Sequence, residues 1–160
     1  MARFIGRGKY SAWFCPAVDS TTAPTRAELN AGTVIIAPGS TMVEAVAAFS
    51  GWDSSVDFVA VPDANSKFNK TIPGTTTAGN PTMEFYSDDA AKPVQTALAE
   101  NTIGFMCFAY KGDVTGRPMQ VWKVQVGGNN EMPDIGNTAH KFRVQFAVLD
   151  EPSKSGVVPA

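Results

Sequence analysis

Apolar and polar residues alternate along several short stretches of the chain, and this pattern predicts β-strands. The clearest stretch runs from His140 to Leu149, where every second residue from Phe142 to Val148 is apolar. Lys141 and Arg143 occupy positions between them. Successive side chains of a strand point to opposite faces of a sheet, so we expect one buried and one polar face here.

The same reasoning, together with short apolar runs bounded by glycine or proline, predicts further strands. They cover Ala12–Val18, Thr33–Ala37, Met42–Phe49, Val56–Val61, Thr82–Tyr86, Ile103–Tyr110 and Met119–Val126. Pro16 interrupts the first of these runs, which makes it an edge strand or a strand end. We expect residues 1–150 to form a single domain and residues 151–160 to form a C-terminal arm, because the last ten residues cannot build a core.

Two segments carry helix signals. Thr25 and Glu28 match the T-x-x-E capping box, and Gly32 supplies a stop, which predicts a short helix over Thr25–Ala31. Lys92–Glu100 has a proline in the first turn and apolar residues on one face, so it predicts the only long helix.

The segment from Asp63 to Asn80 is rich in asparagine, threonine, proline and glycine, and no periodic pattern runs through it. Loops longer than ~12–15 residues are usually functional or disordered. Phe68 and Ile72 are its large apolar side chains, and Pro73-Gly74 permits a sharp bend at the tip. An ordinary mobile surface loop is the alternative interpretation.

The amino-acid composition, taken together with these segments, indicates the fold class. The chain has 160 residues, about one domain, with 16 valines but only 3 leucines. Branched side chains suit a pleated sheet better than a helix. We therefore predict a mostly β fold, either a β-sandwich or an open β-barrel with one flanking α-helix. Strand residues should outnumber helical residues at least twofold.

Charge and reactive residues suggest no enzyme and no metal or cofactor site. The net charge is −2, which does not favour a nucleic-acid binder, and no apolar run approaches the ~18 residues of a membrane span. His140 is the one histidine and has no partner for catalysis or metal binding nearby in the sequence. Cys15 and Cys107 lie in apolar runs and should be buried, unpaired thiols. Residues 1–8 lack the apolar stretch of a signal peptide, so we expect synthesis and folding in a cytoplasm.

Five stretches in the same order resemble the major tail tube proteins of long non-contractile-tailed bacteriophages, especially those of actinobacterial hosts. They are Ala23–Gly32, Ser66–Thr77, Met83–Asp88, Gly112–Arg117, and Arg143–Ala147 with Glu151-Pro152. Each stretch alone is weakly specific, but together they are fairly specific, and the similarity extends over most of the chain in the same order.

The resemblance implies a structural virion protein that is made in the host cytoplasm and has no catalytic residues. Such proteins form hexameric rings in which strands of neighbouring subunits join into a continuous inner barrel. The rings stack on a tape-measure protein and meet tail-end proteins, and the finished tube conducts DNA into the host without binding it specifically. In this family the long loop reaches the next subunit or ring.

The assembly residues expected from the resemblance lie in that loop. Phe68, Ile72 and the Pro73-Gly74 turn should be buried against another copy, with Lys67 and Lys70 as ion-pair partners across the contact. The basic side chains of Lys123, Lys141 and Arg143 lie opposite the apolar faces of their strands. We expect carboxylates to offset these charges, or subunit contacts to cover them.

An alternative from another functional class is a monomeric β-sandwich binding module that recognises carbohydrate through a tryptophan. Trp13, Trp52 and Trp122 are the candidates for its platform. Such a module requires an exposed aromatic ring, whereas a tube protein requires open strand edges and a polar arm that becomes ordered on assembly.

Overall fold

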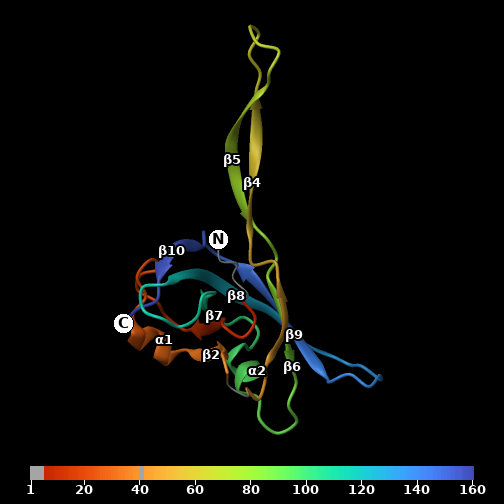
Figure 1. Ribbon diagram of the computed structural model, residues 1–160. Coiled ribbons are helices and arrows are strands. Elements are labelled where there is room, and N and C mark those ends of the chain that lie inside the picture. The colour runs from red at the N-terminus through yellow and green to blue at the C-terminus, as the bar shows by residue number, and fades with distance from the viewer. Residues whose placement is uncertain (1–5, 40–41) are drawn as a thin grey trace.

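The computed structural model describes residues 6–39 and 42–160, and within them the chain is mostly β, with 46% strand and 7% helix. The predicted fold class is confirmed: the main sheet curls into half of a barrel (Figure 1). The sheet contains the strands β1 (Ser11–Cys15), β2 (Thr33–Ile36), β3 (Val46–Ser50), β6 (Thr82–Tyr86), β7 (Ile103–Ala109), β8 (Pro118–Met132), β9 (Lys141–Val148) and β10 (Ser153–Val157). The two helices are α1 (Arg26–Ala31) and α2 (Pro93–Ala97). A second sheet consists of β4 (Ser54–Val61) and β5 (Lys70–Ala78).

The main sheet is antiparallel and runs in the order β2-β1-β7-β8-β9-β6-β3, with β10 paired to β8 outside this path. Strand β8 pairs with β7 and β10 along its first half and with β9 along its second half. The register shifts between Val126 and Gly128, which marks a bulge. Gly127 and Gly128 lie at this bulge, so β8 continues through a pair of glycines that in the sequence suggests a turn.

The two faces of the sheet are covered unequally. One face carries the larger apolar core, in which Phe85, Trp122 and Phe142 are almost fully buried and to which Val94 and Leu98, in and just after α2, contribute. The other face carries a smaller core around Cys107 and is closed by residues that include Leu29 of α1, Val121 of β8 and Val158 beside β10. The rest of that face, over β9 and β6, has no apolar cover from the described residues.

Helix α1 forms as its sequence predicts. The Thr25 hydroxyl accepts a hydrogen bond from the Glu28 backbone N–H, and the Glu28 carboxylate accepts one from the Thr25 N–H in return, at 2.6 Å. Hydrogen bonds to its carboxylate from the Asp19 N–H, and then from the Thr25 N–H and hydroxyl, lower the pKa of Glu28. The capping box therefore gives acceptors to backbone N–H groups at the start of the helix, and Leu29 packs the helix against the smaller core.

Helix α2 is much shorter than predicted, and it is not a long helix. Its start is held by the buried carboxylate of Glu44, which accepts hydrogen bonds from the N–H groups of Val94 (2.6 Å) and Gln95 (3.1 Å). Its end is fixed by the Asn129 side-chain amide, which donates to the carbonyls of Gln95 and Leu98. The chain then turns at Asn101, where φ is 65°, and enters β7.

Two segments that we expected to be irregular contain strands. Half of the expected loop at Asp63–Asn80 forms β5, which pairs with β4. The expected C-terminal arm at residues 151–160 contains β10, and its Pro152 and Val158 are buried. One further prediction is corrected: the strand predicted over Met42–Phe49 begins only at Val46.

Removing the Glu44 carboxylate should destabilise the fold. In Glu44→Ala two buried N–H groups lose their acceptor, which costs about 1–3 kcal/mol of unfolding free energy. For a chain of this size, thermal unfolding should then occur about 2–4 °C lower for each kcal/mol lost. Thermal unfolding followed by circular dichroism measures the shift. Asp89→Ala, in the exposed loop before α2, is the control and should stay within about 0.5 kcal/mol; equal losses in both variants would contradict the assignment.

Candidate assembly surfaces

Strands β4 and β5 form a two-stranded arm that projects away from the body of the subunit (Figure 1). Its residues pair in register from Ser54 with Ala78 to Val61 with Lys70. Among the described elements, neither strand makes more than isolated contacts with anything except the other. The arm therefore has no apolar core of its own, and an isolated two-stranded hairpin is only marginally stable in water.

The structure brings all six expected assembly residues together on this arm, and all of them are exposed. Lys67 and Phe68 lie at the tip, between β4 and β5, whereas Lys70 and Ile72 lie in β5. Phe68 keeps 72% of its surface exposed and Ile72 keeps 53%. Apolar side chains of this size seldom gather on a surface that nothing covers.

The Pro73-Gly74 pair does not form the tip of the arm, contrary to expectation. It lies inside β5, opposite Phe58, where the register shifts and marks a bulge. A Cβ on Gly74 would come within 3.1 Å of the Asp57 carbonyl oxygen, so glycine permits this close approach of the strands. The bend lies at the tip, where the Ser66 N–H donates to the Asp63 carbonyl and the Asn65 N–H donates to its carboxylate.

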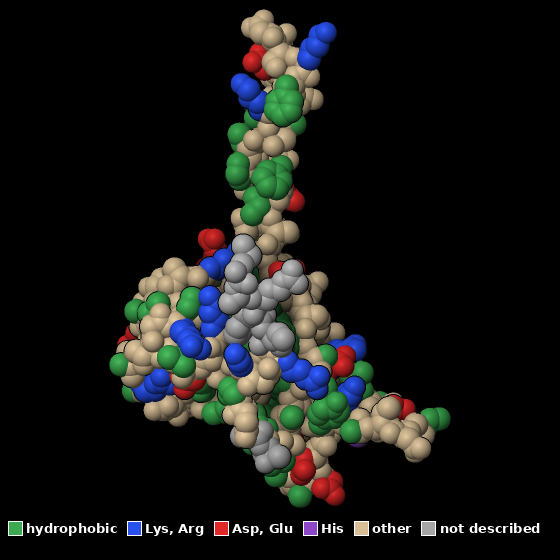
Figure 2. Space-filling view, in the orientation of Figure 1, with side chains coloured by type: hydrophobic (Ala, Val, Ile, Leu, Met, Phe, Trp, Pro, Cys, Tyr) green, Lys and Arg blue, Asp and Glu red, His purple; other side chains and the backbone are tan. Residues whose placement is uncertain are grey.

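Sequence reasoning missed the apolar residues on the other strand of the arm. Phe58, Val59 and Val61 are 67%, 53% and 41% exposed, and Val59 pairs with Ile72. The apolar run at 56–61 was interpreted as an ordinary strand of the body. Its position directly before a segment rich in threonine was the available signal, since together they make a hairpin. Figure 2 shows hydrophobic side chains along the arm and basic ones towards its tip.

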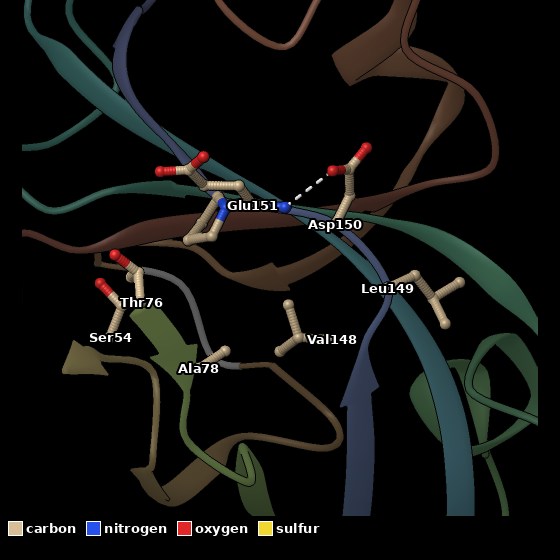
Figure 3. A pocket seen from close by; sticks show the side chains of 8 residues that line it. Ser54, Thr76, Ala78, Val148, Leu149, Asp150 and Glu151 are labelled. Carbon is tan, nitrogen blue, oxygen red and sulfur yellow. Dashed lines mark hydrogen bonds between the residues drawn. The ribbon is translucent and has the colours of Figure 1, made fainter. Parts of the chain in front are cut away.

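A cavity of about 290 Å³ lies where the arm joins the body (Figure 3). Ser54, Thr76 and Ala78 line it from the arm. The segment at 148–152, between β9 and β10, lines it from the body. The cavity combines apolar walls with two carboxylates, and Figure 3 shows the Glu151 side chain lying over Thr76 whereas the Asp150 carboxylate points away.

The uncovered part of the sheet, over β6 and β9, carries polar side chains. The Arg143 guanidinium lies 2.7 Å from the Glu84 carboxylate, directly across the strand pair. The Lys141 ammonium lies 5.6 Å from the centre of the Tyr86 ring. The expected carboxylate is thus present for Arg143, whereas for Lys123 no carboxylate of the described residues lies within ion-pair distance.

The hairpin formed by β8 and β9 ends in a compact turn. Hydrogen bonds from the Thr138 hydroxyl and the Gly136 N–H lower the pKa of Asp134, and Lys141 contributes a smaller attraction. Near this turn His140 Nε2 lies 2.8 Å from the Glu131 carboxylate, on exposed surface. This arrangement is a hydrogen bond between Glu131 of β8 and the residue that precedes β9, and it contains no nucleophile for the histidine to activate.

The tryptophans do not provide the platform that a carbohydrate-binding module needs. Trp13 is 7% exposed and Trp122 is 1% exposed. Trp52 is partly buried, with its ring 4.8 Å from that of Phe108 and 5.6 Å from that of Trp122. All three rings therefore serve the packing of the body. Cys15 and Cys107 are buried and unpaired, as predicted.

A family model described as phage tail tube protein matches residues 1–160 of the chain. The chain belongs to the phage tail tube protein family. This tail tube protein is accordingly a structural component of the virion tail, of a family that assembles into a tube and is not enzymatic. The narrower expectation, a phage of an actinobacterial host, stays a prediction.

Solved structures with little sequence identity to this chain were also compared with it. A chain of the anti-feeding prophage baseplate, determined by cryo-EM with six-fold symmetrisation, superposes with a TM-score of 0.58 at 8% identity, covering 97% of this chain and 99% of that one. The Dit protein of SPP1 gives a TM-score of 0.42 at 12% identity, covering 88% and 50%. Comparison with curated proteins gives no match. No helix among the described residues is long and apolar enough to cross a membrane.

The arm of the isolated tail tube protein should exchange its backbone amides much faster than the body. Its hydrogen bonds have no packed layer on either side, so opening of the arm should cost far less free energy than opening of β7 and β8. Hydrogen–deuterium exchange with mass spectrometry compares peptides from 54–78 with peptides from 103–126. Equal protection in a monomeric sample would show that the arm is supported in a way that its contacts do not reveal.

Proposed function

We propose that the protein polymerises as hexameric rings stacked into the phage tail tube, and that the tube is the conduit through which DNA reaches the host cell. The observation that carries this proposal is the β4–β5 arm, which exposes Phe58, Phe68 and Ile72 and has no support from its own body. A surface of this kind is explained by a neighbouring copy that covers it.

Ring closure would use the two ends of the main sheet. Strand β2 pairs only with β1, and strand β3 pairs only with β6, so each leaves one row of backbone groups open among the described strands. Open edges are templates for pairing with another chain. If β2 of one copy meets β3 of the next, the half-barrels join into a continuous wall, and interfaces of more than ~2,000 Å² are expected for such an obligate assembly.

The interior of the tube has to let DNA slide without adhering to it. Each uncompensated basic contact with a phosphate adds affinity through the release of counterions. The polar face over β6 and β9 meets this requirement if it faces the bore, because Glu84 neutralises Arg143 at 2.7 Å. In this arrangement Lys123 belongs at a contact between subunits.

The remaining partners follow from the family. A tape-measure protein inside the growing tube would set its length, and tail-end proteins would close its two ends. The alternative, a monomeric carbohydrate-binding module, loses its main support because Trp13 and Trp122 are buried and Trp52 packs against the rings of Phe108, Trp122 and Phe146.

Truncation of the arm's apolar side chains should block assembly without unfolding the subunit. In Phe68→Ala with Ile72→Ala, each ring loses burial worth about 1.5–3 kcal/mol per side chain at every arm contact. Negative-stain microscopy and sedimentation measure tubes, and thermal unfolding measures the subunit. Ile103→Ala is the matched control, because Ile103 is also 53% exposed but lies on the body. Normal tubes from the double variant would refute an assembly role for the arm, and an unfolded subunit would place these residues in its own core.

Removing the carboxylate beside Arg143 should make tubes retain DNA. In Glu84→Gln every ring presents uncompensated guanidinium groups, and the resulting affinity for DNA should fall steeply as salt is raised. Co-sedimentation of assembled tubes with short duplex DNA at several salt concentrations measures this effect. Glu100→Gln, an equal change of charge outside the polar face, should leave retention unchanged. If Glu84→Gln tubes retain no more DNA than the parent tubes, Arg143 does not face the bore.

A further inference from the structure

The cavity at the base of the arm has the composition of a receptor for a side chain that is both apolar and flanked by basic residues. Ala78, Val148 and Pro152 supply apolar wall, and the Glu151 carboxylate supplies negative charge at the cavity. The Asp150 carboxylate points away from the cavity and accepts a hydrogen bond from the Glu151 N–H. Leu149, also at the wall, keeps 44% of its surface exposed. Nothing else in the described chain occupies this space.

The two carboxylates are not neutralised within the subunit. Among the described residues, no basic side chain lies within ion-pair distance of Asp150 or Glu151. The ammonium group of Lys154 donates a 2.7 Å hydrogen bond to the hydroxyl of Ser54, which lines the cavity. The charge of the cavity region is therefore net negative.

The tip of the arm is the complement of this cavity. Phe68 is the most exposed phenylalanine of the described residues, with 72% of its surface accessible. Lys67 and Lys70 lie close to it in the chain. Neither lysine forms an ion pair among the described residues. An aromatic side chain with adjacent cations, meeting an apolar hollow with carboxylates, provides both burial and electrostatic complementarity.

We propose that the cavity at 148–152 is the docking site for the arm tip of a second copy of this chain, with Phe68 entering it and Lys67 and Lys70 meeting the Glu151 carboxylate. This inference rests on the proposed function, and it names the surface that the arm contacts. It assigns the contact to residues of the turn between β9 and β10.

The arm of the same copy cannot reach this site. The cavity lies at the base of the arm, and the eight residues of β4 separate base from tip by about 26 Å at ~3.3 Å per residue. The tip and its receptor are thus different surfaces of one molecule. Contacts of this head-to-tail kind do not close on themselves as a dimer does, but repeat from one copy to the next. Stacked rings have this relation along the axis of a tube.

Another acidic hollow on the body fits the arm tip less well. It is lined by Ser87, Asp88, Asp89, Lys92, Glu131 and His140. Its Asp88 carboxylate already accepts hydrogen bonds from two backbone N–H groups, and its Glu131 carboxylate is paired with His140 and Gln95. It has no apolar wall for Phe68. The hollow at the base of the arm is therefore the better receptor.

A charge exchange tests the docking site. In Glu151→Lys the receptor repels the tip, and the protein concentration needed for tube formation should rise at least ~10-fold. Lys67→Glu with Lys70→Glu should have the same effect, and combining all three substitutions should restore assembly towards that of the parent. Asp89→Lys changes net charge equally at the other hollow and should assemble normally. The proposal is overturned if Glu151→Lys forms tubes at the parent concentration, or if Asp89→Lys is the variant that fails.

A cross-link provides a second, independent test. Phe68→Cys with Leu149→Cys should give disulfide-linked ladders when assembled tubes are treated with a mild oxidant, since Cys15 and Cys107 are buried. Cross-links between copies support the site, and their absence from well-formed tubes overturns it. Failure of the parent protein to form any tube would instead refute the proposed function, so the two failures are distinguishable.

Discussion

The pairing of strand β8 with three other strands is the interaction on which the body of the subunit depends. Its first half holds β7 and β10, and its second half holds β9. Through β9 it positions β6 and β3, and through β7 it positions β1 and β2. Asn129, in the same strand, also fixes the end of α2. A single continuous strand thus sets the curvature of the half-barrel and the place of the helix that closes its main core.

The half-barrel buries two apolar cores and leaves three kinds of surface without a packing partner. The sheet ends at open edges, the face over β6 and β9 remains polar and uncovered, and the β4–β5 arm extends without support. In an isolated globular protein each feature would be a liability, because open edges invite pairing and exposed apolar groups invite aggregation. In the proposed tube the open edges and the arm are contacts between copies, and the polar face lines the bore.

Patterns that arise from local chemistry were predictable, and those that arise from distant contacts were not. The capping box at Thr25 and the alternation from Phe142 to Val148 report on neighbouring residues, so sequence alone located α1 and β9. Strand β5 was missed because its threonines, proline and glycine carry no apolar alternation, and it is a strand only because β4 pairs with it. Helix α2 was predicted too long because its ends are set by Glu44 and Asn129, which lie far from it in the sequence. The sequence predicted the arm as an assembly element, whereas its second apolar strand and the receptor proposed for it became visible only in the structure.

The unsupported arm also affects when polymerisation begins. Each residue that becomes fixed loses about 1–2 kcal/mol of backbone entropy, so two free copies that meet have to offset a large ordering cost with a single contact. In the proposed assembly, a copy that joins an existing ring contacts several neighbours at once and offsets that cost over many contacts. Growth should therefore be slow to nucleate and fast to elongate, and free subunits can accumulate in the host until an initiating surface is present. The entropic cost of ordering the arm would then slow the first contacts between free subunits until a template for the tube is present.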